Sequence, residues 1–345
     1  MTTMTPKTRA AGLLLSLLLA GVPEGHSLED LPPAHTETVS LEGVDTLSIS
    51  YGYDAVIVRK SESGDLILRE YMSRDRPRYY ANVSRTAGTL QIRRGRRPWL
   101  PWTWKARLEL YLPPSFRGNL RIVNSSGTFH AETDILDCKT IDISVGSGSV
   151  LLNRLSAETV SVRVSSGDLD IKGMGGASFI SVSSGKLQIG ELTGGEHRIK
   201  SSSGRTRIGL LRGDSAVEIS SGSIAVERAL GRMEAHASSG SLTVEDFSGE
   251  GSFEMSSGNI SLNIRELTGN LRFNLSSGTA EVNIPAGLAF NLDADIRSGK
   301  VLVNEDGGEA LRVSGSSTAL RPFGPSPERT IYARATSGTV VINRR

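Results

Sequence analysis

Apolar and polar residues alternate with a period of two along most of the chain, which is the pattern of β-strands with one buried face. Around a recurring Ser-Gly pair, apolar residues fall at every second position, as Val162 and Val164 do before the pair and Leu169 and Ile171 after it. No helical segment interrupts these units. The pattern therefore predicts an all-β protein made of short strands that meet at bends.

The Ser-Gly pair is an internal repeat, and its spacing indicates the architecture. Successive glycines of the pair lie 18 to 21 residues apart, apart from a final interval of 39 residues. We interpret that interval as two periods with a degenerate copy within residues 313–325. Coils of this length with β periodicity predict a single-stranded β-helix, or β-solenoid, of about twelve coils and on the order of 55 Å in length. The glycines are Gly127, Gly148, Gly167, Gly185, Gly204, Gly222, Gly240, Gly258, Gly278, Gly299 and Gly338.

The serine before each glycine has the parity of the apolar residues that precede it, so we expect it to face inward. Stacked coils would align these serines in a column at an inner corner, where a hydroxyl can bond to turn backbone. The glycine would permit a positive φ or a close approach between coils. Because the copies are equivalent, the column indicates a structural role and not a nucleophile. It comprises Ser166, Ser184, Ser203, Ser221, Ser239, Ser257 and Ser277.

Two other repeated positions favour parallel coils in register. Four residues before the glycine, successive coils carry Lys200, Glu218, His236 and Glu254. These residues predict a solvated ladder of ion pairs, each contributing about 0–1 kcal/mol. A second ladder is expected at another bend, formed by Asn263, Asn283 and Asn304.

The chain divides into three parts. Residues 1–27 have a basic start, an apolar run from Ala10 to Val22 and a polar exit, which predict a secretory signal peptide. Residues 28–124 lack the repeat but contain strand-like segments, and we expect them to start and cap the solenoid. Residues 125–345 form the repeat. An exported protein is expected, in the periplasm, the cell envelope or the extracellular space.

Composition narrows the function classes. The chain has 39 basic and 37 acidic residues, a formal net charge of +2, which argues against nucleic acid as a partner. Its single cysteine, Cys138, cannot form an intramolecular disulfide or a cysteine-based metal site. Only 5% of residues are aromatic, so the core must consist of Val, Ile, Leu and Ala.

One basic loop, residues 93–107, contains all three tryptophans, and a second basic segment, residues 74–80, precedes it. Indole rings beside guanidinium groups suit a contact with an anionic envelope polymer, a membrane surface or an envelope protein. The alternative is that the tryptophans pack over the end of the solenoid. The candidate contact residues are Arg93, Arg94, Arg96, Arg97, Trp99, Trp102, Trp104 and Lys105.

Chemistry for catalysis is missing from the pattern. The five histidines have no ligand spacing, and no phosphate loop, dinucleotide fingerprint or nucleophile elbow is present, so no metal or cofactor is expected. The nearest approach to a carboxylate pair is Asp168 with Asp170, but neighbouring coils place Lys186 and Arg205 there. We therefore predict that the protein is not an enzyme.

The chain resembles the DUF4097 family of β-strand-repeat proteins, whose members are often labelled adhesins. The resemblance rests on the repeat and on its lead-in, residues 44–63, 88–94 and 106–132, including the Leu-Pro-Pro step before the first Ser-Ser-Gly. It implies a bacterial envelope or exported protein with a β-helix-like fold, and it implies no catalytic residues.

These observations predict an exported, non-enzymatic cell-envelope β-solenoid that acts as a structural or adhesin-like binding module through the loop 93–107. Two alternatives stay open. One is an envelope-stress accessory that binds another protein, and the other is a β-helix enzyme acting on polysaccharides.

Overall fold

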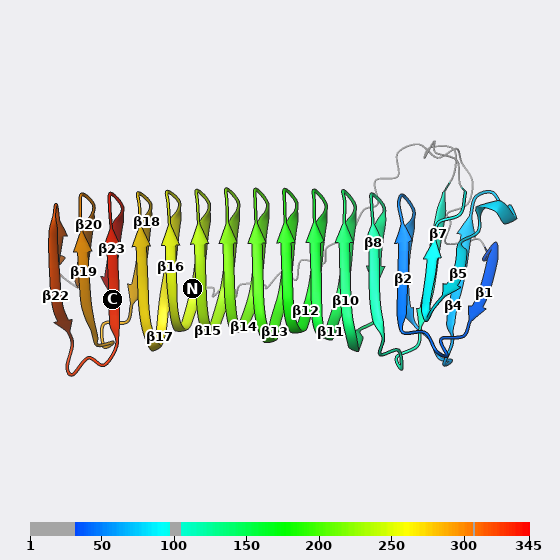
Figure 1. Cartoon of the computed structure of the whole chain (residues 1–345), viewed down its shortest axis with the longest axis horizontal. Helices are drawn as coiled ribbons and strands as arrows, with labels where there is room; N and C mark the ends of the chain where they lie inside the picture. Colours follow the sequence, from blue (N-terminus) through cyan, green and yellow to red (C-terminus); the bar gives the residue numbers. More distant parts are fainter. Residues whose placement is uncertain (1–31, 97–104, 306–307) are drawn as a thin grey trace, which may run out of the picture.

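The repeats wind into a straight, flattened rod of stacked β-coils (Figure 1). The structure is a computed structural model, and it describes residues 32–96, 105–305 and 308–345. Each coil makes a sharp corner at the Ser-Gly pair and a wider bend on the opposite margin, so that its two halves face each other. In β13 (Lys186–Ser201), Leu187 and Ile189 point inward from one half and Ile199 from the other.

The coils stack in parallel and in register, as the sequence predicts. Lys200 pairs with Glu218 of the next coil, and Glu218 pairs with His236 of the coil after it. The solenoid has about 9 turns with coils of ~19 residues. The prediction of about twelve coils is too high, because the ends of the rod depart from regular winding. The regular strands are β10 (Ile135–Val145), β11 (Ser149–Val164), β12 (Asp168–Val182), β13, β14 (Arg205–Ile219), β15 (Ser223–Ala237), β16 (Ser241–Met255), β17 (Asn259–Leu275) and β18 (Thr279–Ile284).

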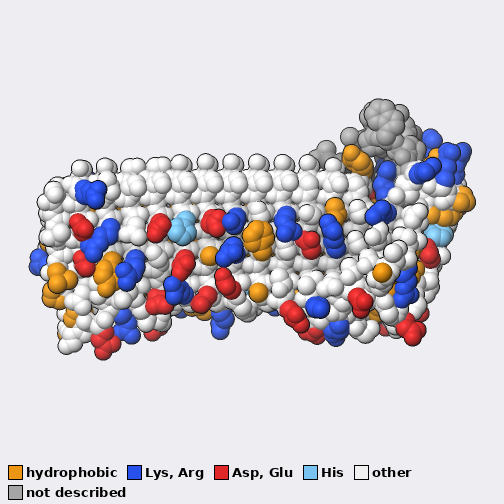
Figure 2. All heavy atoms as spheres, in the orientation of Figure 1, with side chains coloured by type: hydrophobic (Ala, Val, Ile, Leu, Met, Phe, Trp, Pro, Cys, Tyr) orange, Lys and Arg blue, Asp and Glu red, His pale blue; other side chains and the backbone are white. Residues whose placement is uncertain are grey.

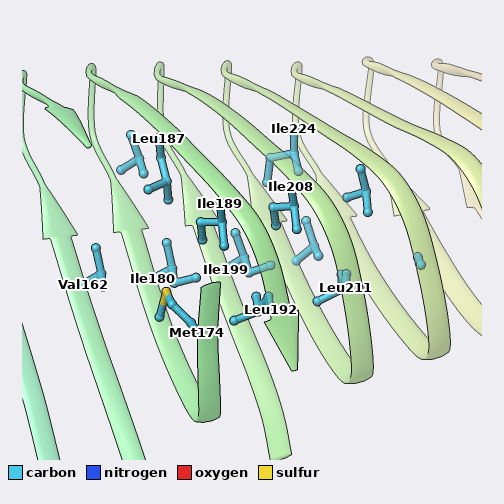
Figure 3. Packing of buried hydrophobic residues seen from close by; sticks show 14 of the residues in the cluster. Val162, Met174, Ile180, Leu187, Ile189, Leu192, Ile199, Ile208, Leu211 and Ile224 are labelled. Carbon is cyan, nitrogen blue, oxygen red and sulfur yellow. The ribbon is translucent and has the colours of Figure 1, made fainter. Parts of the chain in front are cut away.

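One hydrophobic core cluster fills the rod along its length. Figure 3 shows part of it, where aliphatic side chains from Val162 to Ile224 pack between successive coils. Each coil contributes a few inward Val, Ile or Leu residues, which pack between the residues of the coils on either side. Toward the C-terminal end the filling becomes aromatic, and the ring of Phe253 stacks on Phe273 at 5.2 Å between centroids. Burial of this apolar surface, at about 25 cal/mol per Å², drives the stacking.

The C-terminal end is wound out of sequence order. The last coil, β23 (Thr330–Ala335) and β24 (Thr339–Arg344), pairs with β17 and β18 on one side. On its other side it pairs with the earlier coil, β19 (Phe290–Ile296) and β20 (Lys300–Glu305). The final coil is therefore inserted between two coils that precede it in sequence.

No degenerate coil exists within residues 313–325, and that interpretation of the long interval is wrong. Instead β21 (Gly308–Ser314) and β22 (Ser317–Phe323) turn back and pair antiparallel with β20 and β19. They cover strands that would otherwise present an open parallel edge, which is an aggregation hazard.

The N-terminal region is also wound out of sequence order. The coil of β2 (Thr46–Tyr51) and β3 (Ala55–Lys60) lies between β8 (Asn119–Asn124) with β9 (Thr128–Ala131) and β6 (Thr89–Arg93) with β7 (Ala106–Leu112). Antiparallel strands close this end as well. They are β4 (Leu66–Met72) on β7, β5 (Asn82–Thr86) on β6 and β1 (His35–Val39) on β4, with a 3-10 helix at Pro77–Tyr79 between β4 and β5.

The serine column exists, but its predicted inward orientation is wrong. At the corner after β11, Val164 and Gly167 are buried, whereas Ser165 and Ser166 are both exposed. The alternation breaks there because a sharp bend places two successive residues on its convex side and the glycine on its concave side. Ser166, Ser184, Ser203, Ser221, Ser239, Ser257 and Ser277 are all exposed and form an outer margin of the rod.

The predicted asparagine ladder is confirmed, and it contains one further residue, Asn343. Asn283 Nδ2 donates to Asn263 Oδ1 at 2.7 Å, Asn343 Nδ2 to Asn283 Oδ1 at 2.9 Å, and Asn304 Nδ2 to Asn343 Oδ1 at 2.8 Å. Asn343 belongs to the inserted final coil, so the ladder follows the order of the coils in space. Its amides bond to one another, and Asn343 Nδ2 also donates to Glu281 Oε1 at 3.1 Å.

The corner glycines stack so closely that none has room for a side chain. A Cβ on Gly258 would overlap the carbonyl oxygen of Gly240, and one on Gly240 would lie 2.5 Å from the carbonyl oxygen of Gly222. Neither glycine has a positive φ. The need for glycine is therefore a close approach between coils and not an unusual backbone conformation.

We expect Gly258→Ala to lower stability by about 2 kcal/mol, because an added methyl group must displace the backbone of the neighbouring coil. The measurement is the midpoint of urea denaturation followed by circular dichroism. The matched control is Ser257→Ala, which removes an exposed hydroxyl that donates to Ser238 O at 3.1 Å and lies 3.2 Å from Ser239 Oγ. It should cost less than about 1 kcal/mol. Equal effects of the two variants would contradict a steric role for the glycine column.

Candidate contact surfaces

The predicted contact loop is only partly within the described residues. Arg97, Trp99, Trp102 and Trp104 lie outside them. Of the others, Arg93 ends β6 and is exposed, Arg96 is exposed, and Arg94 and Lys105 are half-buried.

The structure brings the first part of this loop against the earlier basic segment. The Arg96 N–H donates to the Arg78 carbonyl oxygen at 3.2 Å. Gly95 approaches the carbonyl oxygens of Tyr79 and Tyr80 so closely that a Cβ there would overlap them. Five exposed arginines from the two segments therefore share one end of the rod, where Figure 2 shows blue side chains gathered at the upper right. We call this group the cap surface; it consists of Arg74, Arg76, Arg78, Arg93 and Arg96.

The tyrosines between these arginines report the local electrostatics. A hydrogen bond of 2.9 Å from the Arg78 guanidinium lowers the pKa of Tyr79, and the charges of Arg78, Arg76 and Arg74 act in the same direction. The neighbouring Tyr80 donates to Asp75, and this hydrogen bond raises the pKa of Tyr80. Asp75, the exposed acid of this segment, thus accepts a hydrogen bond from the Tyr80 hydroxyl. The arginines of the cap surface outnumber it, so the local electrostatic potential is positive.

The Arg94 side chain and the Lys105 backbone hold the loop in place. Arg94 Nε donates to Asp54 Oδ2 at 3.0 Å, and both groups are largely buried. At the other end, the Lys105 N–H donates to Ser73 Oγ at 3.0 Å. These bonds fix both ends of the loop 93–107 to the cap.

A buried ionic layer beneath the cap surface was not predicted. Glu109 is 4% exposed and meets the Arg107 guanidinium at 3.2 Å and the hydroxyls of Tyr71 and Tyr111 at 3.3 and 3.0 Å. Burial, followed by the hydrogen bond to Glu109, raises the pKa of Tyr111. Glu70 is fully buried and accepts the Ala81 N–H at 2.7 Å. In the sequence, Glu70 has the same inward parity as Leu66 and Leu68, and this parity was the signal that it is buried.

The predicted ladder of ion pairs is present on one face of the rod. Lys200 Nζ lies 2.7 Å from Glu218 Oε2, and His236 Nδ1 lies 3.0 Å from Glu254 Oε2. All four side chains are at least 41% exposed, so their contribution to stability is small.

The opposite face holds Asp168 and Asp170, the residues of the enzyme alternative. Asp168 pairs in register with Lys186, and Asp170 pairs with Gln188. Burial raises the pKa of Asp170, and Lys172 partly opposes this shift. Within residues 32–96, 105–305 and 308–345, no three His, Cys, Asp or Glu residues converge to hold a metal ion. In the same ranges, no helix has the length and apolar character needed to cross a membrane.

Comparison with known proteins identifies the family of this chain. The family model described as Toastrack DUF4097 matches residues 45–242 and 229–343, nearly the whole described chain. The chain belongs to the DUF4097 family. No curated protein matches the sequence.

Three solved structures resemble this DUF4097 chain at low identity, and each comparison covers 90% of it. A "putative adhesin" from Bacteroides fragilis is 12% identical over 96% of its length, with a TM-score of 0.26. A "putative cell adhesion protein" from Clostridium sporogenes is 10% identical over 98% of its length, with a TM-score of 0.19. A "putative lipid binding protein" from Parabacteroides distasonis is 13% identical over 96% of its length, with a TM-score of 0.33.

The DUF4097 rod also contains a histidine in its interior. His197 is fully buried, with Nδ1 3.0 Å from Ser178 Oγ and Nε2 3.0 Å from the Arg212 carbonyl oxygen. A carbonyl only accepts, so Nε2 carries the hydrogen and Nδ1 accepts from Ser178. Burial lowers the pKa of His197. The imidazole is therefore neutral in the folded rod.

Acidification should destabilise the protein through His197. Its pKa is 6.5 when unperturbed and lower in the fold, so below pH 6.5 the unfolded chain binds a proton that the folded chain does not. The stability present above pH 6.5 is then lost, by up to about 2 kcal/mol at pH 5. Urea denaturation at pH 7.5 and 5.0 measures the loss.

Replacement of the buried imidazole tests this assignment. His197→Gln should flatten the pH dependence, whatever its effect at pH 7.5. The control His236→Gln, at an exposed position, should retain most of the wild-type slope. A wild-type slope in His197→Gln would refute the assignment.

Proposed function

We propose that this protein is an exported, non-enzymatic module of the cell envelope that binds anionic surfaces through the cap surface and the adjoining loop 93–107. Membership of the DUF4097 family supports a structural or binding role and not catalysis. The main observation in support of the proposal is that the two arginine segments lie side by side, joined by the backbone hydrogen bond from Arg96 to Arg78.

The chemistry of the cap surface favours phosphate or carboxylate as its ligand. Guanidinium groups bind both in a bidentate manner and stay charged at any physiological pH. The backbone holds the arginines on a structured end of the rod, so binding does not have to order a mobile segment. Tryptophan in the same loop would add affinity at a lipid headgroup region, where indole rings concentrate.

Two sources could supply this ligand chemistry, the headgroups of anionic lipids and the repeating acids of an envelope polymer. The regular coils form a continuous stack in which several exposed charges are paired, as in Lys200 with Glu218, and we assign this part of the rod the role of a spacer. The module would then attach by one end and project its length away from the surface.

Loss of cap charge should weaken binding to anionic surfaces. Near an anionic membrane each cation contributes about 1 kcal/mol, so Arg74→Gln, Arg76→Gln and Arg93→Gln together should reduce the affinity about a hundredfold. Cosedimentation with vesicles containing 30% phosphatidylglycerol, and pull-down on immobilised polygalacturonate, measure the two sources separately.

The matched control removes three exposed arginines elsewhere, Arg205, Arg207 and Arg312, each changed to Gln. It changes net charge equally and should bind as the wild type does. Equal losses in both triple variants would show that net charge, and not the cap surface, attracts the ligand. Unchanged binding in the cap variant would contradict the proposal.

The tryptophans separate a lipid surface from a soluble polymer. Replacing Trp99, Trp102 and Trp104 with Ala should leave the far-ultraviolet circular dichroism unchanged and lower vesicle binding about tenfold or more, since each indole adds interfacial affinity. Binding to polygalacturonate should fall less. Unchanged association with both probes would remove the loop from the contact surface.

A further inference from the structure

An open groove runs along the rod beside the serine margin, in the C-terminal half and away from the cap surface. Its volume is about 770 Å³. It crosses six coils, from the coil of Glu218 to that of Asp295, so at about 4.8 Å per coil its length is about 24 Å. In Figure 2 the serine margin is the stepped upper edge, nearly free of charged side chains along its length, with a row of charged side chains below it.

The two walls of the groove repeat once per coil. The first serine of each corner pair forms one wall, as in Ser220, Ser238 and Ser276. The ladder residues four positions before the corner glycine form the other, including Glu218, His236 and Glu254. The floor is the backbone between them. Because the coils are in register, both walls advance together along the rod axis.

The serine wall offers unused hydrogen-bonding groups. The hydroxyls of Ser220, Ser238 and Ser276 make no side-chain hydrogen bond with any residue that the structure describes. Their backbone N–H groups are engaged with the preceding coil, as in Ser220 N–H to Ser201 O at 3.0 Å and Ser238 N–H to Ile219 O at 2.8 Å. The fold therefore holds the serine hydroxyls, which can donate hydrogen bonds to a ligand, at a fixed spacing.

The charge of the groove selects among linear polymers. Of its carboxylates, Glu218 lies 2.7 Å from Lys200 Nζ and Glu254 lies 3.0 Å from His236 Nδ1. Asp295 shares the C-terminal end of the groove with Arg297 and Arg334. The lining therefore carries little net charge. Carboxylate and hydroxyl oxygens accept hydrogen bonds from hydroxyl and ammonium groups. Unlike the cap surface, this groove therefore offers an acidic polymer no net electrostatic attraction.

We propose that this groove binds a linear glycan without acidic groups, laid parallel to the rod axis. An extended chain of pyranose rings advances per sugar by nearly the rise of one coil, so successive rings meet equivalent serine and ladder positions. Each sugar then repeats the same set of hydrogen bonds. The site is separate from the proposed anionic contact and does not depend on it.

Isothermal titration of the full-length protein tests the groove with hexamers of three charge classes: cellohexaose, chitosan hexamer and hexagalacturonate. We expect cellohexaose or chitosan hexamer to bind at least tenfold more tightly than its own dimer, and hexagalacturonate not to bind in the groove. Failure of both non-acidic hexamers to bind, or tighter binding of hexagalacturonate that persists in the cap triple variant, would overturn the proposal.

Adjacent serines of one corner provide a matched pair of variants. Ser238 lines this groove, whereas Ser239 lines a depression on the opposite side of the margin. Ser238→Tyr should block the groove and weaken glycan binding at least tenfold, and Ser239→Tyr should not. Thermal unfolding confirms that both variants are folded. Equal binding by the two variants would assign the glycan to another place, and the cap triple variant should bind the hexamer as the wild type does.

Discussion

The close contact between corner glycines is the constraint on which the rest of this structure depends. At each corner the carbonyl of one glycine occupies the space that a side chain on the next would need, as Gly258 and Gly240 show. Because the backbones meet there, a coil cannot slide by one residue without placing a residue that has a side chain, such as Ser257 or Asn259, in that contact. The glycine column thus fixes the register, and register in turn aligns the aliphatic core, the asparagine ladder and the ion pairs.

The same contact explains which parts of the fold were predictable. Period, parallel stacking and the ladders follow from spacing alone, since each depends on equivalent positions in successive coils. The orientation of Ser166 and its equivalents did not follow, because alternation was extended through a bend that interrupts it. The order of the last coils was hidden for another reason. Repeats are interchangeable in sequence, and only side chains such as Asn343, with partners on both sides, distinguish neighbours in space.

The candidate surfaces were predictable to different degrees. Composition alone identified the basic loop, but folding was needed to bring Arg96 beside Arg78 and to show that Arg94 is tied to Asp54. Buried polar groups such as Glu109 and His197 were missed because their partners come from distant strands or from neighbouring coils. The groove has no sequence signature of its own. It arises where an exposed serine and a ladder residue flank one stretch of backbone, coil after coil.

The insertion of β23 and β24 between earlier coils has a consequence for biogenesis. A chain that emerges from its N-terminus can add β10 to β18 one coil at a time, each on a finished template. Residues 290–323 have no such template when they appear, because the coil on which they stack is synthesised after them. The strands at this end of the rod therefore stay unpaired until residues 330–344 are synthesised and pair with a coil on each side. A stalled or clipped chain would expose the edge of β17 and β18, which marks it for chaperones and proteases.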